Sequence, residues 1–110
     1  MNIKELIIKN NPNSPKDKKR AIGFFIMNNG KTITRKFGSA VGFTYFDGAT
    51  EQTRNAYLAR HEVRENWNDI MTAGALAKWV LWTDTNRSKI EKIINRKFGI
   101  PKIKIQITKQ

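Results

Sequence analysis

Cysteine is absent from this chain of 110 residues. Its absence excludes disulfide scaffolds, cysteine-based zinc sites and thiol catalysis, and it suits a reducing compartment. Long apolar runs are absent as well, since the N-terminal segment contains only the short run Leu6 to Ile8. That run is much too short for the core of a signal peptide or for a membrane span. We therefore expect a soluble protein that is made in a cytoplasm and has no membrane partner.

Acidic residues are scarce and unevenly placed. The chain has 9 Asp and Glu against 21 Lys and Arg, a formal net charge of +12. The net charge is +7 over residues 1–38, −1 over residues 39–83 and +6 over residues 84–110. A charge of this size attracts polyanions and exceeds what solubility requires. The pattern therefore predicts a polyanionic or acidic partner that contacts the two ends of the chain.

Both ends carry strand patterns. Residues 3–9 predict a short strand, and the alternation of Ile and polar residues over 102–109 predicts a half-buried strand with lysines outside. Between 21 and 38, Asn29-Gly30 predicts a hairpin with a two-residue type I′ turn. That turn would place on one core-facing side Ile22, Phe24, Ile26, Ile33 and Phe37.

The middle of the chain, residues 49–99, is predicted to be helical. Thr50 fits an N-cap, and one helical face is predicted from the spacing of Ala56, Ala59, Val63, Trp67 and Ile70. Residues 74–82 are apolar almost all round, so this helix is expected to be buried or to be covered by a second chain. The last helix is predicted to begin at Ser88 or Thr85 and to end at Gly99.

These elements predict one domain over residues 1–110, with an α+β fold. A basic, β-rich part (1–38) precedes the helical middle (49–99) and the C-terminal strand (102–109). The N-terminal strand, the hairpin and the C-terminal strand are expected to form a small antiparallel sheet packed against two or three helices. Such a sheet would bring the two basic ends of the chain together.

Residues that could carry catalysis are few. His61 and Glu65 are four apart and could supply two metal ligands, but a catalytic zinc takes three protein ligands and the chain has no other histidine. We expect His61 to pair with Glu65 instead. Glu62, Glu65 and Asp69 could form a metal-binding carboxylate cluster, although the interleaved Arg60 and Arg64 favour an ion-paired helix face. We therefore predict no enzyme, no metal and no cofactor.

The aromatic residues of the middle segment suggest packing. All three tryptophans lie between Trp67 and Trp82, in apolar surroundings. They could form a platform on which bases stack, but core or subunit-interface packing is the preferred interpretation. The candidate packing or assembly residues are Tyr57, Trp67, Trp79 and Trp82.

A set of motifs in this segment resembles a known pattern. It comprises R-x-x-Y-x-x-R-H from Arg54 to His61, E-N-W from Glu65, T-A-G from Thr72, and W-x-L-W from Trp79. Together these resemble small uncharacterised proteins of large double-stranded DNA viruses and tailed phages, over about residues 37–100. The chain departs from the pattern at 75–77, where an aromatic residue and a serine would be expected. That family has no assigned activity, so the resemblance implies a viral or phage origin and no functional residue.

Two functions follow as predictions. The first is a structural component of a virion (a minor capsid, cement or capsid-associated protein) that binds other virion proteins or the packaged genome. It would be found in the virion, and in the host cytoplasm before assembly, and helix 74–82 could mediate self-association. The alternative is a sequence-nonspecific nucleic-acid-binding protein of the infected cell. A nuclease based on the three carboxylates is a minor third option.

Both predicted functions use the same contact residues. The candidates for contact with nucleic acid or an acidic partner are Lys16, Lys18, Lys19, Arg20, Lys31, Arg35, Lys36, Lys102, Lys104 and Lys109. Taken one at a time, each of these is also compatible with an ordinary solvated side chain.

Overall fold

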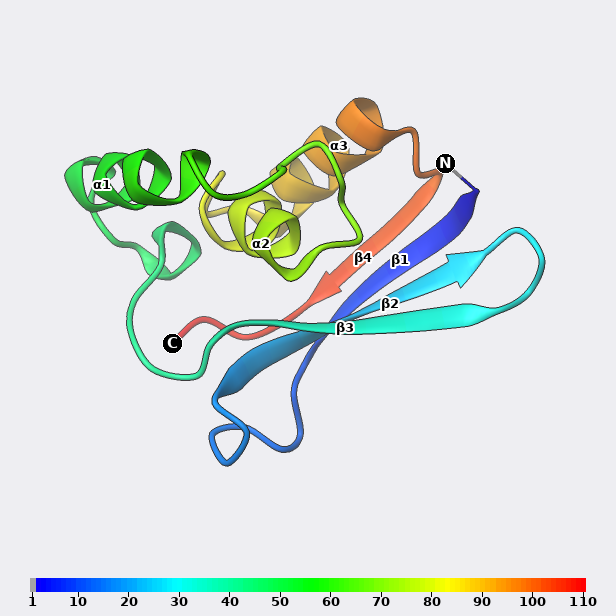
Figure 1. Ribbon diagram of the computed structural model, residues 1–110, viewed down its shortest axis with the longest axis horizontal. Coiled ribbons are helices and arrows are strands. Elements are labelled where there is room, and N and C mark those ends of the chain that lie inside the picture. Colours follow the sequence, from blue (N-terminus) through cyan, green and yellow to red (C-terminus); the bar gives the residue numbers. More distant parts are fainter. Residues whose placement is uncertain (1) are drawn as a thin grey trace.

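The computed structural model describes residues 2–110 and confirms the predicted α+β class. A four-stranded sheet carries all the helices on one of its faces (Figure 1). The strands are β1 (Ile3–Asn10), β2 (Lys19–Met27), β3 (Thr32–Ser39) and β4 (Lys102–Gln106). The helical segments are η1 (Tyr45–Asp47), α1 (Glu51–Glu62), α2 (Ala73–Leu76), η2 (Ala77–Leu81) and α3 (Arg87–Phe98).

The sheet is mixed, not wholly antiparallel as predicted. Its strand order is β3-β2-β1-β4, and β1 pairs antiparallel with β2 but parallel with β4. The alternation of residues 102–109 correctly predicted a half-buried strand, and Ile105 and Ile107 are buried. Alternation does not determine strand direction, which depends here on the path of the chain through the helical layer before it returns beside β1.

The hairpin register differs by one residue from the prediction. The loop has three residues, 28–30, because the Gly30 N–H donates to the Met27 carbonyl and the Met27 N–H donates to the Lys31 carbonyl. Gly30 adopts a φ of 86°, and the Asn29 side chain accepts from the Lys31 N–H at 3.0 Å. This is the other common hairpin geometry, a type I turn followed by a left-handed glycine.

The shifted register exchanges the faces of β2, since side chains alternate along a strand. Phe25 now pairs with Ile33, and Ala21 with Phe37. Phe25, Ala21 and Phe37 are fully buried beneath the helices. The residues predicted for the core, Ile22, Phe24 and Ile26, instead lie on the opposite face of the sheet and are only half-buried.

The first helix is shorter and less buried than its apolar spacing predicted. Thr50 is its N-cap, as expected, and accepts from the Thr53 N–H at 3.2 Å. The helix ends at Glu62, no residue within it is buried, and Val63 is 83% exposed. The face that contacts the rest of the protein contains Tyr57 and Leu58, not the predicted alanines.

The apolar segment 74–82 is buried by its own domain. Ala75, Leu76, Val80 and Leu81 have almost no exposed surface. The segment packs between β3 and α3, so a second chain is not needed to cover it. Among the helices of residues 2–110, none is long and apolar enough to cross a membrane.

The last helix has a different start from the one predicted. Its N-cap is Asn86, whose side chain accepts from the Lys89 N–H. Its C-cap is Gly99, as predicted, with a φ of 68°. The buried residues of this helix are Ile90 and Ile94, which face the core.

One buried ion pair joins three distant segments. The Arg20 guanidinium of β2 contacts the Asp47 carboxylate of η1 through two hydrogen bonds of 2.7 and 2.6 Å. Arg20 also donates to the Thr108 carbonyl, and the Gln110 N–H donates to Asp47 at 2.7 Å. Both charged side chains are almost completely buried, with 3% and 0% exposed. The pair therefore holds the C-terminal segment against the start of β2.

The protonation of Asp47 is controlled by these contacts. Burial by itself raises the pKa of Asp47, but the hydrogen bonds from Arg20, the Gln110 N–H and Thr44 outweigh burial and lower that pKa from 3.8 to about 2. A carboxyl group whose pKa is lowered on folding stabilises the protein above its unfolded pKa. That stability is lost as the pH falls from about 4 toward 2.

Replacement of Asp47 should be strongly destabilising. Asp47→Asn leaves the buried Arg20 charge without its counter-ion, and we expect the free energy of unfolding to fall by about 3–5 kcal/mol at pH 7. The fall in stability between pH 4 and pH 2 should also become shallower. Urea unfolding followed by tryptophan fluorescence at several pH values measures both effects.

The matched control is Glu62→Gln, which removes one exposed carboxylate at the end of α1. We expect this variant to stay within about 0.5 kcal/mol of the wild type. An Asp47→Asn protein that is as stable as the Glu62→Gln protein would show that the Arg20–Asp47 pair does not hold the fold together.

Candidate nucleic-acid interface

The face of the sheet that no helix of residues 2–110 covers is called here the open face (Figure 1). The strand registers place twelve side chains on it in three rows of four. From β3 to β4 these rows are Thr32, Ile26, Glu5 and Lys102, then Thr34, Phe24, Ile7 and Lys104, then Lys36, Ile22, Lys9 and Gln106.

The centre of the open face is apolar and its edges are basic. Ile7, Ile22, Phe24 and Ile26 occupy the two central strands and are half-buried. The exposed residues Lys9, Lys36, Lys102 and Lys104 surround them, and Glu5 is the single acid of the face. The Lys9 ammonium lies 5.9 Å from the centre of the Phe24 ring. Cations and an aromatic ring are therefore presented side by side.

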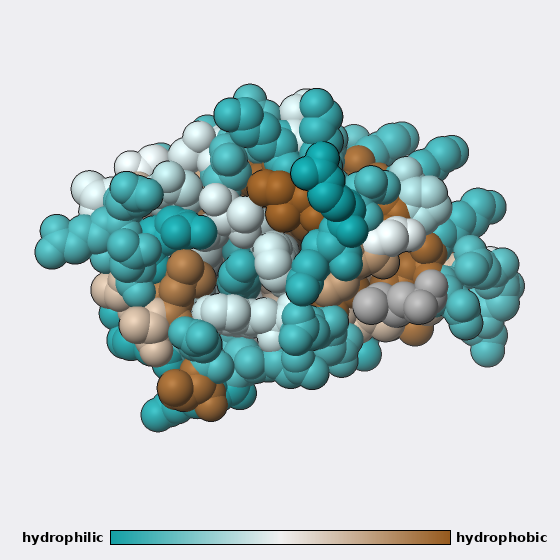
Figure 2. All heavy atoms as spheres, turned by 90° about the horizontal axis from the view of Figure 1, so that it is seen from above, coloured by the Kyte–Doolittle hydropathy of each residue, from teal (hydrophilic) through white to brown (hydrophobic). Residues whose placement is uncertain are grey.

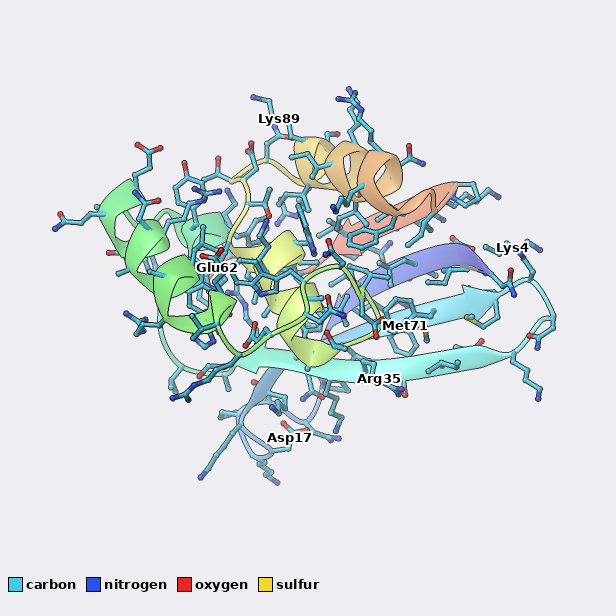
Figure 3. All side chains as sticks on the ribbon, turned by 45° about the horizontal axis from the view of Figure 1, so that its top comes forward. Lys4, Asp17, Arg35, Glu62, Met71 and Lys89 are labelled. Atoms are coloured by element: carbon cyan, nitrogen blue, oxygen red, sulfur yellow. The ribbon has the colours of Figure 1, made fainter. Side chains whose placement is uncertain are left out.

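Lys36 is held in place by the loop that joins β1 to β2. Its ammonium donates to Asp17 at 2.7 Å, and the Asn11 side-chain amide donates to the same carboxylate. The hydrogen bonds from Lys36 and Asn11 lower the pKa of Asp17 to about 2. Asp17 lies in this loop, on the opposite side of the molecule from Lys89 of α3 (Figure 3). It therefore fixes the loop at one end of the open face.

The predicted contact residues are only partly gathered by the fold. Lys36, Lys102 and Lys104 lie on the open face. The exposed residues Lys16, Lys18, Lys19 and Lys31 lie at the ends of the sheet, in the two loops or at the start of β2. The basic residues of α3 lie in the helical layer on the other side, so the two basic ends of the chain meet only through their strands.

Two predicted contacts have other roles, and a third, Arg35, remains exposed. Arg20 is buried in the ion pair with Asp47, so its assignment to a partner-binding surface was wrong. Lys109 folds back, donates to the Thr85 carbonyl at 2.7 Å and lies over the ring of Phe46. Arg35 is exposed on the edge strand β3, where its guanidinium donates to the Thr34 carbonyl (Figure 3).

The sequence prediction missed Lys9 and Phe24. Lys9 belongs to the first strand, to which no outward face had been assigned, and Phe24 had been placed in the core by the hairpin register. Glu5, Ile7 and Lys9 are spaced two apart, so in a strand they lie on the side opposite to Leu6 and Ile8. This spacing was a signal that Lys9 faces outward. No local signal separated the two hairpin registers, because Asn-Gly fits both turn types.

The aromatic residues of the middle segment form a second cluster, in the helical layer. Tyr57 of α1 is stacked between His61 and Trp82, with ring centroids 4.1 and 4.0 Å apart. The Arg54 side chain donates to the Trp82 carbonyl at 2.8 Å. Burial, together with the charge of Glu65, raises the pKa of Tyr57 to about 12. This stack joins α1 to the end of η2, and its rings pack on one another.

Glu65 connects the stack to the two other tryptophans. One carboxylate oxygen pairs with His61 at 3.0 Å, as predicted, and the other accepts from the Trp67 indole at 2.9 Å. The Trp67 carbonyl in turn accepts from the Trp79 indole at 2.7 Å. The predicted packing residues Tyr57, Trp67, Trp79 and Trp82 thus lie within one cluster.

Lys78 places a cation against two rings of this cluster. Its ammonium lies 3.4 Å from the centre of the Trp79 ring and 5.4 Å from that of Trp67. Burial, with the nearby charges of Arg54 and Lys97, lowers the pKa of Lys78 to about 8. The attraction of the ring faces for a cation acts in the opposite direction. Lys78 is therefore half-buried against the tryptophan rings.

The carboxylates considered for metal chemistry are not assembled into a site. Glu65 is engaged by His61 and Trp67. Glu62, at the end of α1 (Figure 3), and Asp69, in the following loop, are exposed on separate segments. Within residues 2–110 no group of three or more His, Asp or Glu side chains is placed to hold a metal ion. The site with a defined chemical character is therefore the open face, which combines cations with apolar surface.

Comparison of the chain with protein-family models, with curated proteins and with solved structures gives no match. The function of the surfaces described above is consequently inferred from their geometry alone.

Gly74 provides a test of the aromatic cluster. A Cβ at this position would lie 2.7 Å from the carboxylate carbon of Glu65, so an alanine must push Glu65 away from His61 and Trp67. Hydrogen bonds to charged groups contribute about 1.5–3 kcal/mol, and Gly→Ala within a helix returns about 0.5–1 kcal/mol. We expect Gly74→Ala to lower the free energy of unfolding by about 1 kcal/mol, measured by urea unfolding.

The Glu65→Ala background is the control for this substitution. Without the carboxylate there is no clash, and Gly74→Ala should then raise the free energy of unfolding by about 0.5–1 kcal/mol. The same sign of effect in both backgrounds would show that Glu65 does not pack against Gly74 as described.

Proposed function

We propose that the protein binds nucleic acid through the open face, without sequence preference. The observation that carries the proposal is the arrangement of Lys9, Lys36, Lys102 and Lys104 around an apolar centre that contains Phe24. These lysines come from three different strands, and an acidic side chain occurs at only one of the twelve positions. The face therefore presents a positive surface of a kind that the phosphate backbone can contact.

The apolar centre favours a single strand over a duplex. A duplex keeps its bases stacked inside and offers mainly phosphates, whereas a single strand exposes base faces as well. Base faces stack on aromatic side chains, and such stacking does not depend on base identity. Phe24, with Lys9 beside it, supplies such a contact in the middle row, and Ile7 extends the apolar surface next to it.

Neutralisation of phosphates also makes the binding dependent on salt. Lys36 is already paired with Asp17. If Lys9, Lys102 and Lys104 each neutralise one phosphate, the logarithm of the association constant should fall with the logarithm of salt concentration with a slope of about −2.1 for a single strand. The affinity for a labelled oligothymidylate should then fall about 20-fold between 50 and 200 mM salt. Fluorescence anisotropy measures this slope.

The lysines responsible can be identified with matched double variants. Lys102→Gln with Lys104→Gln should reduce the slope to about −0.7, since two of the three phosphate contacts are removed. Lys89→Gln with Lys92→Gln removes the same charge from α3, in the helical layer, and should leave the slope near its wild-type value. Absence of binding at 50 mM salt, or an equal effect of both double variants, would exclude the open face as the binding site.

A structural role in a virus particle is a second proposal, and it concerns location more than mechanism. The exposed side chains of Val41 and Phe43, which are 76% and 55% accessible, favour it because such side chains often mark contacts with other proteins. An open face bound to packaged genome would be compatible with this role. Mass spectrometry of purified particles of the virus that encodes the chain should detect it at stoichiometric levels. Its absence from the particles would remove this proposal without affecting nucleic-acid binding.

A further inference from the structure

A groove of about 290 Å³ lies in the helical layer, away from the open face. The loop after β3 forms one wall, α1 forms the other, and the end of η2 forms the floor. The lining residues from the end of β3 and the loop are Gly38, Ser39, Val41, Gly42, Phe43 and Thr44. Those from the helices are Thr53, Tyr57, Arg60, Ala77, Leu81 and Trp82.

The loop wall of the groove exposes large apolar side chains. Within residues 2–110 the exposed large hydrophobic side chains are Val41, Phe43 and Val63, and the first two line this groove. Seen from the helical side, most of the surface is hydrophilic and hydrophobic atoms show only in separate patches (Figure 2). Exposed apolar side chains that lie together are typical of an interaction site.

The loop that carries these side chains is anchored at both ends. The Val41 N–H donates to the Ser39 hydroxyl, and the Ala40 N–H donates to the Lys18 carbonyl. After Phe43, the Thr44 N–H donates to Asp47, the partner of the buried Arg20. The Val41 and Phe43 side chains are therefore presented by backbone that the fold itself positions.

The floor of the groove is apolar and fixed. Leu81 and Trp82 are almost completely buried, and the Trp82 ring is stacked on Tyr57 with an angle of 7° between the planes. The other face of Tyr57 is covered by His61. Because these ring faces are already stacked, the floor offers no free face on which a nucleobase could stack. It suits an apolar side chain better.

The charge at the groove is positive. Arg60 is the one charged residue of the lining, and no acid lines it. The neighbouring residues of the R-x-x-Y-x-x-R-H motif make internal contacts: Arg54 with the Trp82 carbonyl, and His61 with Glu65. Arg60 by contrast is exposed and makes no ion pair within residues 2–110. Arginine next to apolar surface is a common combination in protein interfaces.

We propose that this groove docks a short segment of an acidic partner protein, in which a large apolar side chain lies next to a carboxylate. The apolar side chain fills the space between Phe43 and the Tyr57–Trp82 stack, and the carboxylate pairs with Arg60. A second copy of this chain fits poorly, because its net charge of +12 would repel the first. The groove lies on the helical side of the sheet, so nucleic acid and the partner segment can be bound at the same time.

The probe for this inference is a capped peptide, acetyl-Asp-Glu-Phe-Asp-Leu-amide, titrated into ¹⁵N-labelled protein and followed by NMR. We expect the amide shifts to change at the groove residues and not on β4.

A peptide with Asn and Gln in place of the acids should bind at least tenfold more weakly. Phe43→Ser and Arg60→Gln should each weaken binding about tenfold. Val63→Ser removes an equally exposed side chain outside the groove and should have no effect.

Three results would overturn the inference. The first is the absence of groove shifts at millimolar peptide. The second is shifts confined to the lysines of the open face. The third is concentration-dependent dimerisation that Phe43→Ser abolishes, which would assign the groove to a second copy. Oligonucleotide binding by Phe43→Ser, expected to stay within twofold of wild type, is measured in parallel. An absence of peptide binding at the groove is thereby distinguished from an absence of nucleic-acid binding at the open face.

Discussion

The buried pair of Arg20 and Asp47 is the interaction on which the arrangement of the chain depends. Two opposite charges removed from water are tolerated only when each is well paired and hydrogen-bonded. Here the carboxylate also accepts from the Gln110 N–H, and the guanidinium also donates to the Thr108 carbonyl. One charge pair thus joins β2, η1 and the C-terminal segment. That segment directly follows β4, which pairs with β1, so strands from both ends of the chain share one sheet.

The few acidic residues of the chain include several with structural roles. Several carboxylates make contacts inside the fold: Asp47 with Arg20, Glu65 with His61 and Trp67, and Glu91 with the Ile105 N–H of β4. A carboxylate engaged in this way adds little negative charge to the surface that a partner meets. Because burial of Asp47 also removes the Arg20 charge from the surface, the pair leaves the net charge of +12 unchanged. The open face carries a single acid.

The motif residues of the middle segment have mainly structural roles. Glu65 lies against Gly74, which explains why a residue without a side chain suits that position. Tyr57 and Trp82 stack, and the carbonyl of Trp67 accepts from Trp79. This pattern of charged and aromatic residues, which superficially resembles a reactive site, therefore connects α1, the loop that follows it, α2 and η2. Arg60 is the member of the motif that faces outward, into the groove.

The sequence by itself determined the class of fold, the strand at each end and the Thr50 and Gly99 caps, because these depend on local spacing and hydropathy. It predicted that segment 74–82 is covered, but the tertiary structure decided that its own domain covers it. The sequence also predicted the pairing of His61 with Glu65, which are one helical turn apart. Only the tertiary structure decided which face of β2 is covered, since a one-residue shift of the hairpin exchanges Phe24 and Phe25 between the core and the open face. The direction of β4, the burial of Arg20 and the position of Lys9 among the other lysines of the open face depend on contacts between residues far apart in the chain. Local patterns do not encode such contacts.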